Sequence, residues 1–134
     1  MPAVVDWEAL ITAAWRVRAN AHAPYSRFAV GAALQSLDGT IHAGCNVENI
    51  AFPSGQCAEA SAIGNMVSTA GAISIVAVVV ATEALTFTWP CGQCRQKLVE
   101  LAAPDCRVMS VTADARSAPR GLAVLLPGAL TSLT

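Results

Sequence analysis

Two short cysteine-bearing segments constrain this chain more than any other feature of its sequence: Gln-Cys-Ala-Glu at residues 56–59 and Pro-Cys-Gly-Gln-Cys at residues 90–94. Cys91 and Cys94 are three residues apart, so a helix that begins there presents both sulfurs on one face. Cys57 adds a third soft ligand from a separate part of the sequence. A structural zinc usually takes four protein ligands, whereas a catalytic zinc takes three and keeps a position for water. The cysteines therefore predict one catalytic zinc ion per chain, in a fold that brings the two segments together.

Glu59 is the carboxylate that accompanies these ligands. It lies two residues after Cys57, and side chains at that spacing do not share a helical face. We therefore expect Glu59 beside the metal, as a general acid and base, rather than among its ligands. Both cysteine segments are predicted to begin helices, whose positive ends lower thiol pKa values and favour the thiolate that zinc binds.

The length of the chain, 134 residues, suits a single domain spanning residues 1–134 that can bury a core without disulfides. Hydrophobic residues make up 54% of the sequence and charged residues only 13%, against a typical ~25% charged. A monomer of this composition would have little polar surface to offer to water. We therefore expect some of the apolar surface to be buried between subunits.

Charge and cysteine usage indicate the partners and the compartment. The formal net charge is −1 and no run of Lys or Arg occurs, which argues against binding to a phosphate backbone. Residues 1–6 lack a basic stretch followed by an apolar signal core, and no uncharged apolar segment reaches the ~18 residues that span a membrane. Five cysteines, an odd number, favour metal binding over a disulfide framework. We expect a cytoplasmic protein without nucleic-acid or membrane partners.

Hydrophobic periodicity and turn residues predict an alternation of helices and strands. The predicted helices cover residues 6–20, 57–70, 91–102 and 122–126, and the predicted strands cover residues 28–36, 40–46, 73–81 and 107–112. Asp38-Gly39 predicts a hairpin turn between the first two strands. The uncharged third strand is expected at the middle of the sheet, and Gly64 suggests close packing of the second helix against a neighbour. This order argues for an α/β protein with a mixed sheet.

Five short motifs, in this order along the chain, carry a resemblance to a known family. They are Pro-Tyr-Ser-Arg-Phe-Ala-Val-Gly-Ala-Ala-Leu at 24–34, Gly-Cys-Asn-Val-Glu-Asn at 44–49, Cys-Ala-Glu at 57–59, Pro-Cys-Gly-Gln-Cys-Arg-Gln at 90–96 and Leu-Leu-Pro at 125–127. The chain resembles the zinc-dependent cytidine and deoxycytidylate deaminases, in their small homo-oligomeric, three-cysteine form. The resemblance implies a three-layer helix-sheet-helix fold with a mixed, mostly parallel sheet of about five strands, assembled as a homotetramer.

The resemblance also implies a reaction, the hydrolytic deamination of the nucleosides cytidine and 2′-deoxycytidine to the uridines in pyrimidine salvage. Cys57, Cys91 and Cys94 would hold the zinc. Water activated by that zinc would attack C4 of the pyrimidine, while Glu59 moves protons to N3 and to the departing ammonia.

A substrate-binding set follows from the same resemblance. Asn46 and Glu48 are alternate residues of a strand end and point to one face, where in the family they bind the ribose hydroxyls. Phe28 resembles the family's base-stacking aromatic residue, and Ala58 completes the set. On the residues alone, Asn46 and Glu48 are equally typical of a polar strand end facing solvent, and Phe28 of a core residue.

The sequence departs from the family pattern at two positions. Ala60 stands where many relatives carry an arginine that relieves the thiolate charge, and Leu130 stands where a phenylalanine often reaches the site of a neighbouring subunit. We expect Arg95, directly after Cys94, to supply the missing cation by donating to a thiolate sulfur. The alternative is a solvated surface arginine.

Other functions remain open at this stage. The nearest is deamination of another aminopyrimidine nucleoside, such as a blasticidin-type antibiotic. A non-catalytic, zinc-stabilised oligomer belongs to a different class, and Glu59 argues against it because structure alone has no need of that carboxylate. A redox Cys-x-x-Cys protein is the weakest alternative.

Overall fold

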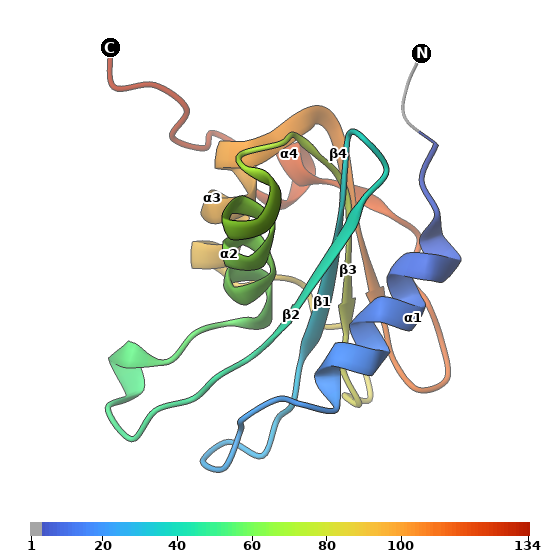
Figure 1. Cartoon of the computed structure of the whole chain (residues 1–134), viewed down its shortest axis with the longest axis vertical. Coiled ribbons are helices and arrows are strands. Elements are labelled where there is room, and N and C mark those ends of the chain that lie inside the picture. The colour runs from blue at the N-terminus through green and yellow to red at the C-terminus, as the bar shows by residue number, and fades with distance from the viewer. Residues whose placement is uncertain (1–3) are drawn as a thin grey trace.

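A computed structural model describes residues 4–134; residues 1–3, the start of the segment that lacks signal-peptide features, lie outside the described part. The elements form three layers (Figure 1). A five-stranded sheet lies in the middle, with α1 (Trp7–Arg18) on one face and α2 (Ala58–Ala70) and α3 (Gly92–Leu101) on the other. The predicted helix-sheet-helix architecture is confirmed. Across the described residues, no helix combines the length and the hydropathy that crossing a membrane would require.

The first helix forms where the sequence pattern places it. The Asp6 carboxylate accepts a hydrogen bond from the Ala9 backbone N–H at 3.1 Å and so caps α1. Leu10 and Ala14 on its inner face are fully buried against the sheet. The contact is close, because a Cβ atom added at Gly31 of the sheet would lie 2.0 Å from the Ala14 carbonyl oxygen.

The sheet has the strand order β2-β1-β3-β4-β5. Its members are β1 (Gly31–Ser36), β2 (Ile41–Cys45), β3 (Ile75–Ala81), β4 (Ala102–Val111) and β5 (Arg120–Gly121). The first two strands pair antiparallel through the predicted hairpin. The third is buried along its whole length at the middle of the sheet, as its uncharged sequence predicts.

The directions of the strands differ from the expectation. The sheet is mixed, but only the β3–β4 pair is parallel, whereas β1–β2, β1–β3 and β4–β5 are antiparallel. The predicted predominance of parallel pairs is therefore wrong. Parallel neighbours need a crossover such as α3, which joins β3 to β4, while the short connections at both edges of the sheet can join only antiparallel neighbours.

The second helix lies directly on the hairpin. A Cβ atom added at Gly44 of β2 would lie 2.2 Å from the Ala62 backbone nitrogen, so only glycine fits beneath α2. Gly71 ends the helix with a φ of 86°. The expectation for Gly64 is wrong, because a Cβ atom there would have no neighbour within 4 Å.

The C-terminal part departs from the predicted boundaries. The fourth strand begins at Ala102, immediately after α3, rather than at residue 107. It pairs with the two-residue β5, which the sequence pattern does not reveal, and α4 (Leu122–Leu125) follows at the predicted place.

Alternation along the strands divides the core into two layers. One lies under α1 and contains Leu10, Ala14, Ala33, Ala77, Val79, Met109 and Val111. The other lies under α2 and α3 and contains Leu34, Met66, Val78, Val80, Leu98, Val108, Leu122 and Leu125. Both cysteine segments belong to the second layer, because they begin the helices that cover it.

Candidate active site

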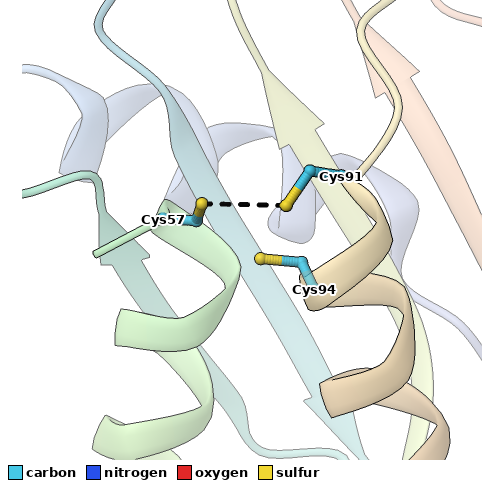
Figure 2. A group of neighbouring side chains, drawn as sticks. All are labelled: Cys57, Cys91 and Cys94. Carbon is cyan, nitrogen blue, oxygen red and sulfur yellow. Dashed lines mark hydrogen bonds between the residues drawn. The ribbon is translucent and has the colours of Figure 1, made fainter. Parts of the chain in front are cut away.

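Three cysteines converge at the starts of α2 and α3 (Figure 2). Cys57 directly precedes α2, Cys91 directly precedes α3, and Cys94 lies in the first turn of α3. Their sulfurs all lie within 4.8 Å of one another, and the Sγ atoms of Cys57 and Cys91 are 3.9 Å apart. The first two residues are exposed and Cys94 is buried. The fold thus brings together the two segments that the sequence singles out.

This donor set fits zinc. Tetrahedral zinc with Zn–S bonds of about 2.3 Å keeps its sulfur ligands about 3.8 Å apart, close to the Cys57–Cys91 separation. Burial raises the pKa of the Cys57 and Cys94 thiols, helped by the negative charges of neighbouring groups, which is opposite to the lowering expected from helix starts. The pKa of Cys91 is lowered as expected, because hydrogen bonds with Cys94 and Cys57 outweigh the effect of its burial. A divalent cation among the sulfurs reverses this cost, because coordination deprotonates thiols outright.

Glu59 lies in the first turn of α2, beside the sulfurs, and is only 4% exposed. Burial raises the pKa of this carboxyl group above its ordinary value. A carboxyl group with a raised pKa holds its proton more firmly than a solvated one, which suits a group that must donate a proton during the reaction. The sequence places Glu59 beside the ligands, and the structure has it there.

A cavity of about 270 Å³ opens beside the cysteines and contains most of the predicted site. Its lining residues come from the loop before β1, the end of β2, the starts of α2 and α3, and the middle strand. They are Ser26, Phe28, Val30, Asn46, Glu48, Cys57, Ala58, Glu59, Val80, Thr88, Trp89 and Cys91. The four predicted substrate-binding residues are all among them.

Glu48 holds the loop that leads to Phe28. Its Oε1 atom accepts hydrogen bonds from the backbone N–H groups of Tyr25, at 2.9 Å, and Ser26, at 3.1 Å, and its Oε2 atom accepts one from the Ser26 hydroxyl. The Ser26 hydroxyl is the largest cause that holds the pKa of Glu48 below its usual value. A carboxylate has about four lone-pair sites, so Glu48 retains capacity to accept from a ligand hydroxyl.

Asn46 connects the end of β2 to the segment before β1. Its Nδ2 atom donates to the Phe28 carbonyl oxygen at 2.8 Å, and its Oδ1 atom accepts from the Val30 N–H at 2.9 Å. The second amide hydrogen and a second lone pair remain for a ligand. Asn46 therefore belongs to the cavity wall and also fixes the backbone of Phe28 and Val30, in the loop before β1.

Phe28 follows an unusual backbone position. Arg27 has a φ of 58°, and it is the only non-glycine residue with a positive φ in the described part of the chain. The Phe28 N–H then donates to the Ser26 hydroxyl oxygen at 3.0 Å. This kink leaves Phe28 39% exposed at the cavity rather than in the core.

Arg95 does not lie as predicted. Its Nε atom donates to the Pro90 carbonyl oxygen at 2.6 Å and its Nη1 atom to the Leu125 carbonyl oxygen at 2.7 Å, and no bond to a thiolate sulfur occurs within residues 4–134. The planar fork of guanidinium donors is satisfied by these two backbone carbonyl oxygens. Arg95 instead holds the backbone just before Cys91.

Sequence reasoning did not single out five of the lining residues: the apolar Val30 and Val80, and Ser26, Thr88 and Trp89. Ser26 falls inside the first motif, so its position was available. Trp89 carries a usable signal, because a large aromatic residue directly before Pro90 and Cys91 must lie close to any metal they hold. Thr88 has no signal of its own.

Comparison with known proteins agrees with this geometry. Residues 5–110 match the model of the cytidine and deoxycytidylate deaminase zinc-binding region. The chain therefore belongs to the zinc-dependent cytidine and deoxycytidylate deaminase family, and the zinc predicted from the cysteines is the cofactor of that family.

Individual relatives of the chain in this family include curated and structurally characterised cytidine deaminases. The cytidine deaminase of Sporosarcina psychrophila is 39% identical over 127 residues, which cover 95% of this chain and 93% of that protein. The crystal structure of cytidine deaminase from Mycobacterium tuberculosis superposes with a TM-score of 0.83 at 36% identity, covering 96% of this chain and all of that one. The cytidine deaminase of Burkholderia pseudomallei gives a TM-score of 0.85 at 36% identity, covering 93% and 99% of the two chains.

Proposed function

We propose that this chain catalyses the zinc-dependent hydrolytic deamination of cytidine and 2′-deoxycytidine to uridine and 2′-deoxyuridine. The observation that carries the proposal is the convergence of three cysteine sulfurs and a buried glutamate on one cavity that also contains Asn46 and Glu48. Relatives that share more than a third of the sequence are named cytidine deaminases, which supports the same substrate.

The roles follow from the chemistry of the residues. Cys57, Cys91 and Cys94 would hold zinc, which supplies the Lewis acidity that makes water a nucleophile at neutral pH. Glu59 would take both protons of the attacking water in turn, delivering the first to N3 of the pyrimidine and the second to the amino group at C4. The C4–N4 bond breaks, ammonia departs, and the oxygen from water becomes the carbonyl oxygen of uracil. The raised pKa of Glu59 favours the protonated form that donates to the pyrimidine.

The substrate-binding roles complete the proposal. Phe28 and Ala58 would contact the base, and Asn46 and Glu48 would bind the sugar hydroxyls through the lone pairs and the amide hydrogen that their own hydrogen bonds leave free. A site that hydrogen-bonds a sugar rejects the free base, because its polar groups are then left unpaired.

A nucleoside panel tests the proposed reaction. The zinc-loaded protein is incubated with cytidine, 2′-deoxycytidine, cytosine and a blasticidin-type aminopyrimidine nucleoside, and ultraviolet absorbance and released ammonia are followed. We expect turnover of the first two and strong rejection of cytosine. Turnover of the antibiotic alone would show that the substrate is that nucleoside and not cytidine. Turnover of none of the four compounds would indicate a zinc-stabilised protein without this activity.

Metal content tests the ligand set. Replacement of Cys57, Cys91 or Cys94 by alanine should each lower zinc from about one ion per chain, measured by metal analysis after gel filtration. Cys106→Ala provides the matched control, because Cys106 is a buried thiol outside the cluster. Full zinc retention in the three ligand variants would contradict the assignment.

We further propose that the chain is one domain and acts as a homotetramer in pyrimidine salvage in the cytoplasm. Continuous core layers on both faces of one sheet support a single domain. Exposed apolar side chains near the cavity support association, with Tyr25 47%, Ile50 79% and Phe52 73% exposed. Five free cysteines suit a reducing compartment. A monomeric mass by light scattering at micromolar concentration would contradict the tetramer.

A further inference from the structure

Trp89 lines the cavity on the side of the second cysteine segment, two residues before Cys91. We infer that Trp89 is a specificity-determining residue, whose indole restricts the space beside the reacting carbon and excludes pyrimidines that carry additional groups at C5 or on N4. The inference rests on the proposed function, because it concerns the selectivity of that same site.

The geometry of the ring leads to this role. The reacting carbon C4 must lie next to the sulfurs, and N3 must face Glu59, which begins α2. The sugar, attached at N1 across the ring from C4, lies toward Asn46 and Glu48. The C5 edge and the outer side of N4 then face away from α2, toward the segment that precedes α3. Trp89 is the largest side chain of that segment in the cavity wall.

The segment that carries Trp89 is fixed at three successive residues. The Thr88 N–H donates to the Ser110 hydroxyl oxygen at 2.9 Å, and the Pro90 carbonyl oxygen accepts from Arg95 at 2.6 Å. Between them, the guanidinium of Arg120 lies over the Trp89 ring, 4.3 Å from its centroid. A cation at this distance attracts the face of an indole. The Trp89 indole is therefore fixed in the cavity lining and has little freedom to move aside for a larger substrate.

Strand register places Arg120 on the correct side of the sheet. Arg120 of β5 lies opposite Val108 of β4, and cross-strand partners share a face. Val108 belongs to the core layer under α2 and α3, so Arg120 projects on the side of the candidate site. The neighbouring pair Arg107 and Trp7 repeats the same contact at 5.7 Å in the opposite layer, which provides a matched control.

Substrate selectivity is the first test. The zinc-loaded wild type, Trp89→Phe and Trp89→Ala are compared on cytidine, 5-methylcytidine and N4-methylcytidine. We expect kcat/KM for at least one methylated substrate, relative to cytidine, to rise about 10–200-fold in Trp89→Ala, the range associated with one methylene group in an apolar pocket. A smaller rise is expected in Trp89→Phe. An unchanged ratio in an active, zinc-loaded Trp89→Ala overturns the inference and leaves the proposed function intact.

The positioning role of Arg120 is tested separately. Arg120→Gln removes the cation over the indole and should raise the same selectivity ratio severalfold, whereas Arg120→Lys should restore most of the discrimination. Arg107→Gln, which removes the equivalent cation from Trp7, should leave the ratio unchanged. Equal changes in the Arg120→Gln and Arg107→Gln variants would show a general loss of packing rather than positioning of Trp89.

A binding measurement avoids dependence on turnover and on truncation of Trp89. In a Trp7→Phe, Trp15→Phe background, Trp89 is the only remaining tryptophan, and titration with uridine should change its fluorescence. A Trp89→Phe variant that keeps Trp7 and Trp15, both on α1 across the sheet, should show no uridine-dependent change. Saturable uridine binding, established by equilibrium dialysis, without any response from Trp89 would contradict its place in the site. Absence of cytidine turnover in the wild type would instead contradict the proposed function.

Discussion

At the scale of a single residue, Asn46 combines a structural role with a proposed role in binding the substrate. Its amide joins the Phe28 carbonyl to the Val30 N–H and so holds the residues that flank the cavity, while the rest of its hydrogen-bonding capacity faces the same space. Replacement of Asn46 would therefore disturb the Phe28 backbone as well as the proposed contact to the sugar. For this reason, cleaner tests at this scale use residues with one function each.

Glu59→Gln is such a test. The amide keeps the volume of the side chain but cannot carry a proton between water and the pyrimidine, so kcat should fall by about 10²–10⁴ while zinc content and thermal midpoint stay close to wild type. Glu100→Gln, an exposed change of the same chemistry on α3, is the control. Near wild-type turnover in Glu59→Gln would remove Glu59 from the mechanism.

Arg95→Gln tests the contact that replaced the predicted thiolate bond. Loss of the guanidinium frees the Pro90 carbonyl and loosens the backbone before Cys91, so zinc affinity should fall about 10–100-fold in competition with a chromophoric chelator. Lys97→Gln removes an exposed cation from the same helix and should leave the affinity unchanged. Equal affinities in both variants would make Arg95 irrelevant to the metal site.

The site was predictable where chemistry and spacing act together. The cysteine segments and Glu59 stand out because few other roles need three thiols and a carboxylate in that pattern. Thr88 was not predictable, because its role depends on which loop folds over the cavity, whereas Trp89 was overlooked although it directly precedes Pro90 and Cys91. Arg95 was misassigned because sequence adjacency to Cys94 does not tell which acceptors a long side chain can reach.

At the scale of elements, the close contact between α2 and β2 positions the first cysteine segment. Gly44 allows the helix backbone to approach the strand, and a Cβ atom there would meet the Ala62 nitrogen at 2.2 Å. Any substituent at Gly44 must push the helix away from the sheet. Because Cys57 and Glu59 begin this helix, the displacement would also reach the site.

A pair of glycine substitutions tests this contact. Gly44→Ala should lower the free energy of unfolding by roughly 1–3 kcal/mol through overpacking, measured by urea denaturation. Gly64→Ala, in the exposed middle of the same helix with open space around it, should raise that free energy by about 0.5–1 kcal/mol. Changes of the same sign in both variants would contradict the close approach.

Hydrophobic pattern predicted the existence of the main elements but not the directions of the strands. The buried strand β3 and the capped helix α1 followed from their apolar residues and from Asp6. The two-residue β5 is too short to produce a pattern. The antiparallel β1–β3 pair was missed because the hydrophobic pattern of a buried strand does not depend on whether its neighbour is parallel or antiparallel. Strand direction depends on how the connecting segments cross the sheet.

At the scale of the whole molecule, the metal and the thiols can be probed together. Chelation of zinc in a Cys45→Ser background should make Cys57 and Cys91, both exposed, reactive toward an aromatic disulfide reagent at pH 8. Cys106 should remain unreactive, because burial raises the pKa of its thiol to about 12 and only the thiolate reacts. Spectrophotometric thiol titration with and without chelator measures both effects. Rapid modification of Cys106 in the folded protein would contradict its burial.

The pH dependence of that buried thiol has a definite sign. The folded pKa of Cys106 lies above the unfolded value, so the neutral thiol contributes fully to stability below about pH 8.5. This contribution is lost as the pH rises toward 12. Cys106→Ala should therefore show a smaller decline of thermal midpoint between about pH 9 and 11 than the parent protein. An identical decline would assign the alkaline loss to other groups.

The meeting of the two cysteine segments also makes the metal part of the folding of the chain. Cys57 and Cys91 lie 34 residues apart, and the intervening polymer contains a complete helix and the middle strand. An ion that joins them closes this loop and removes extended conformations from the unfolded ensemble; a disulfide closing a loop of similar length would stabilise a protein by about 4 kcal/mol. Removal of zinc should consequently loosen the starts of α2 and α3 before the rest of the fold, so that the metal acts on the stability of the chain as well as on its chemistry.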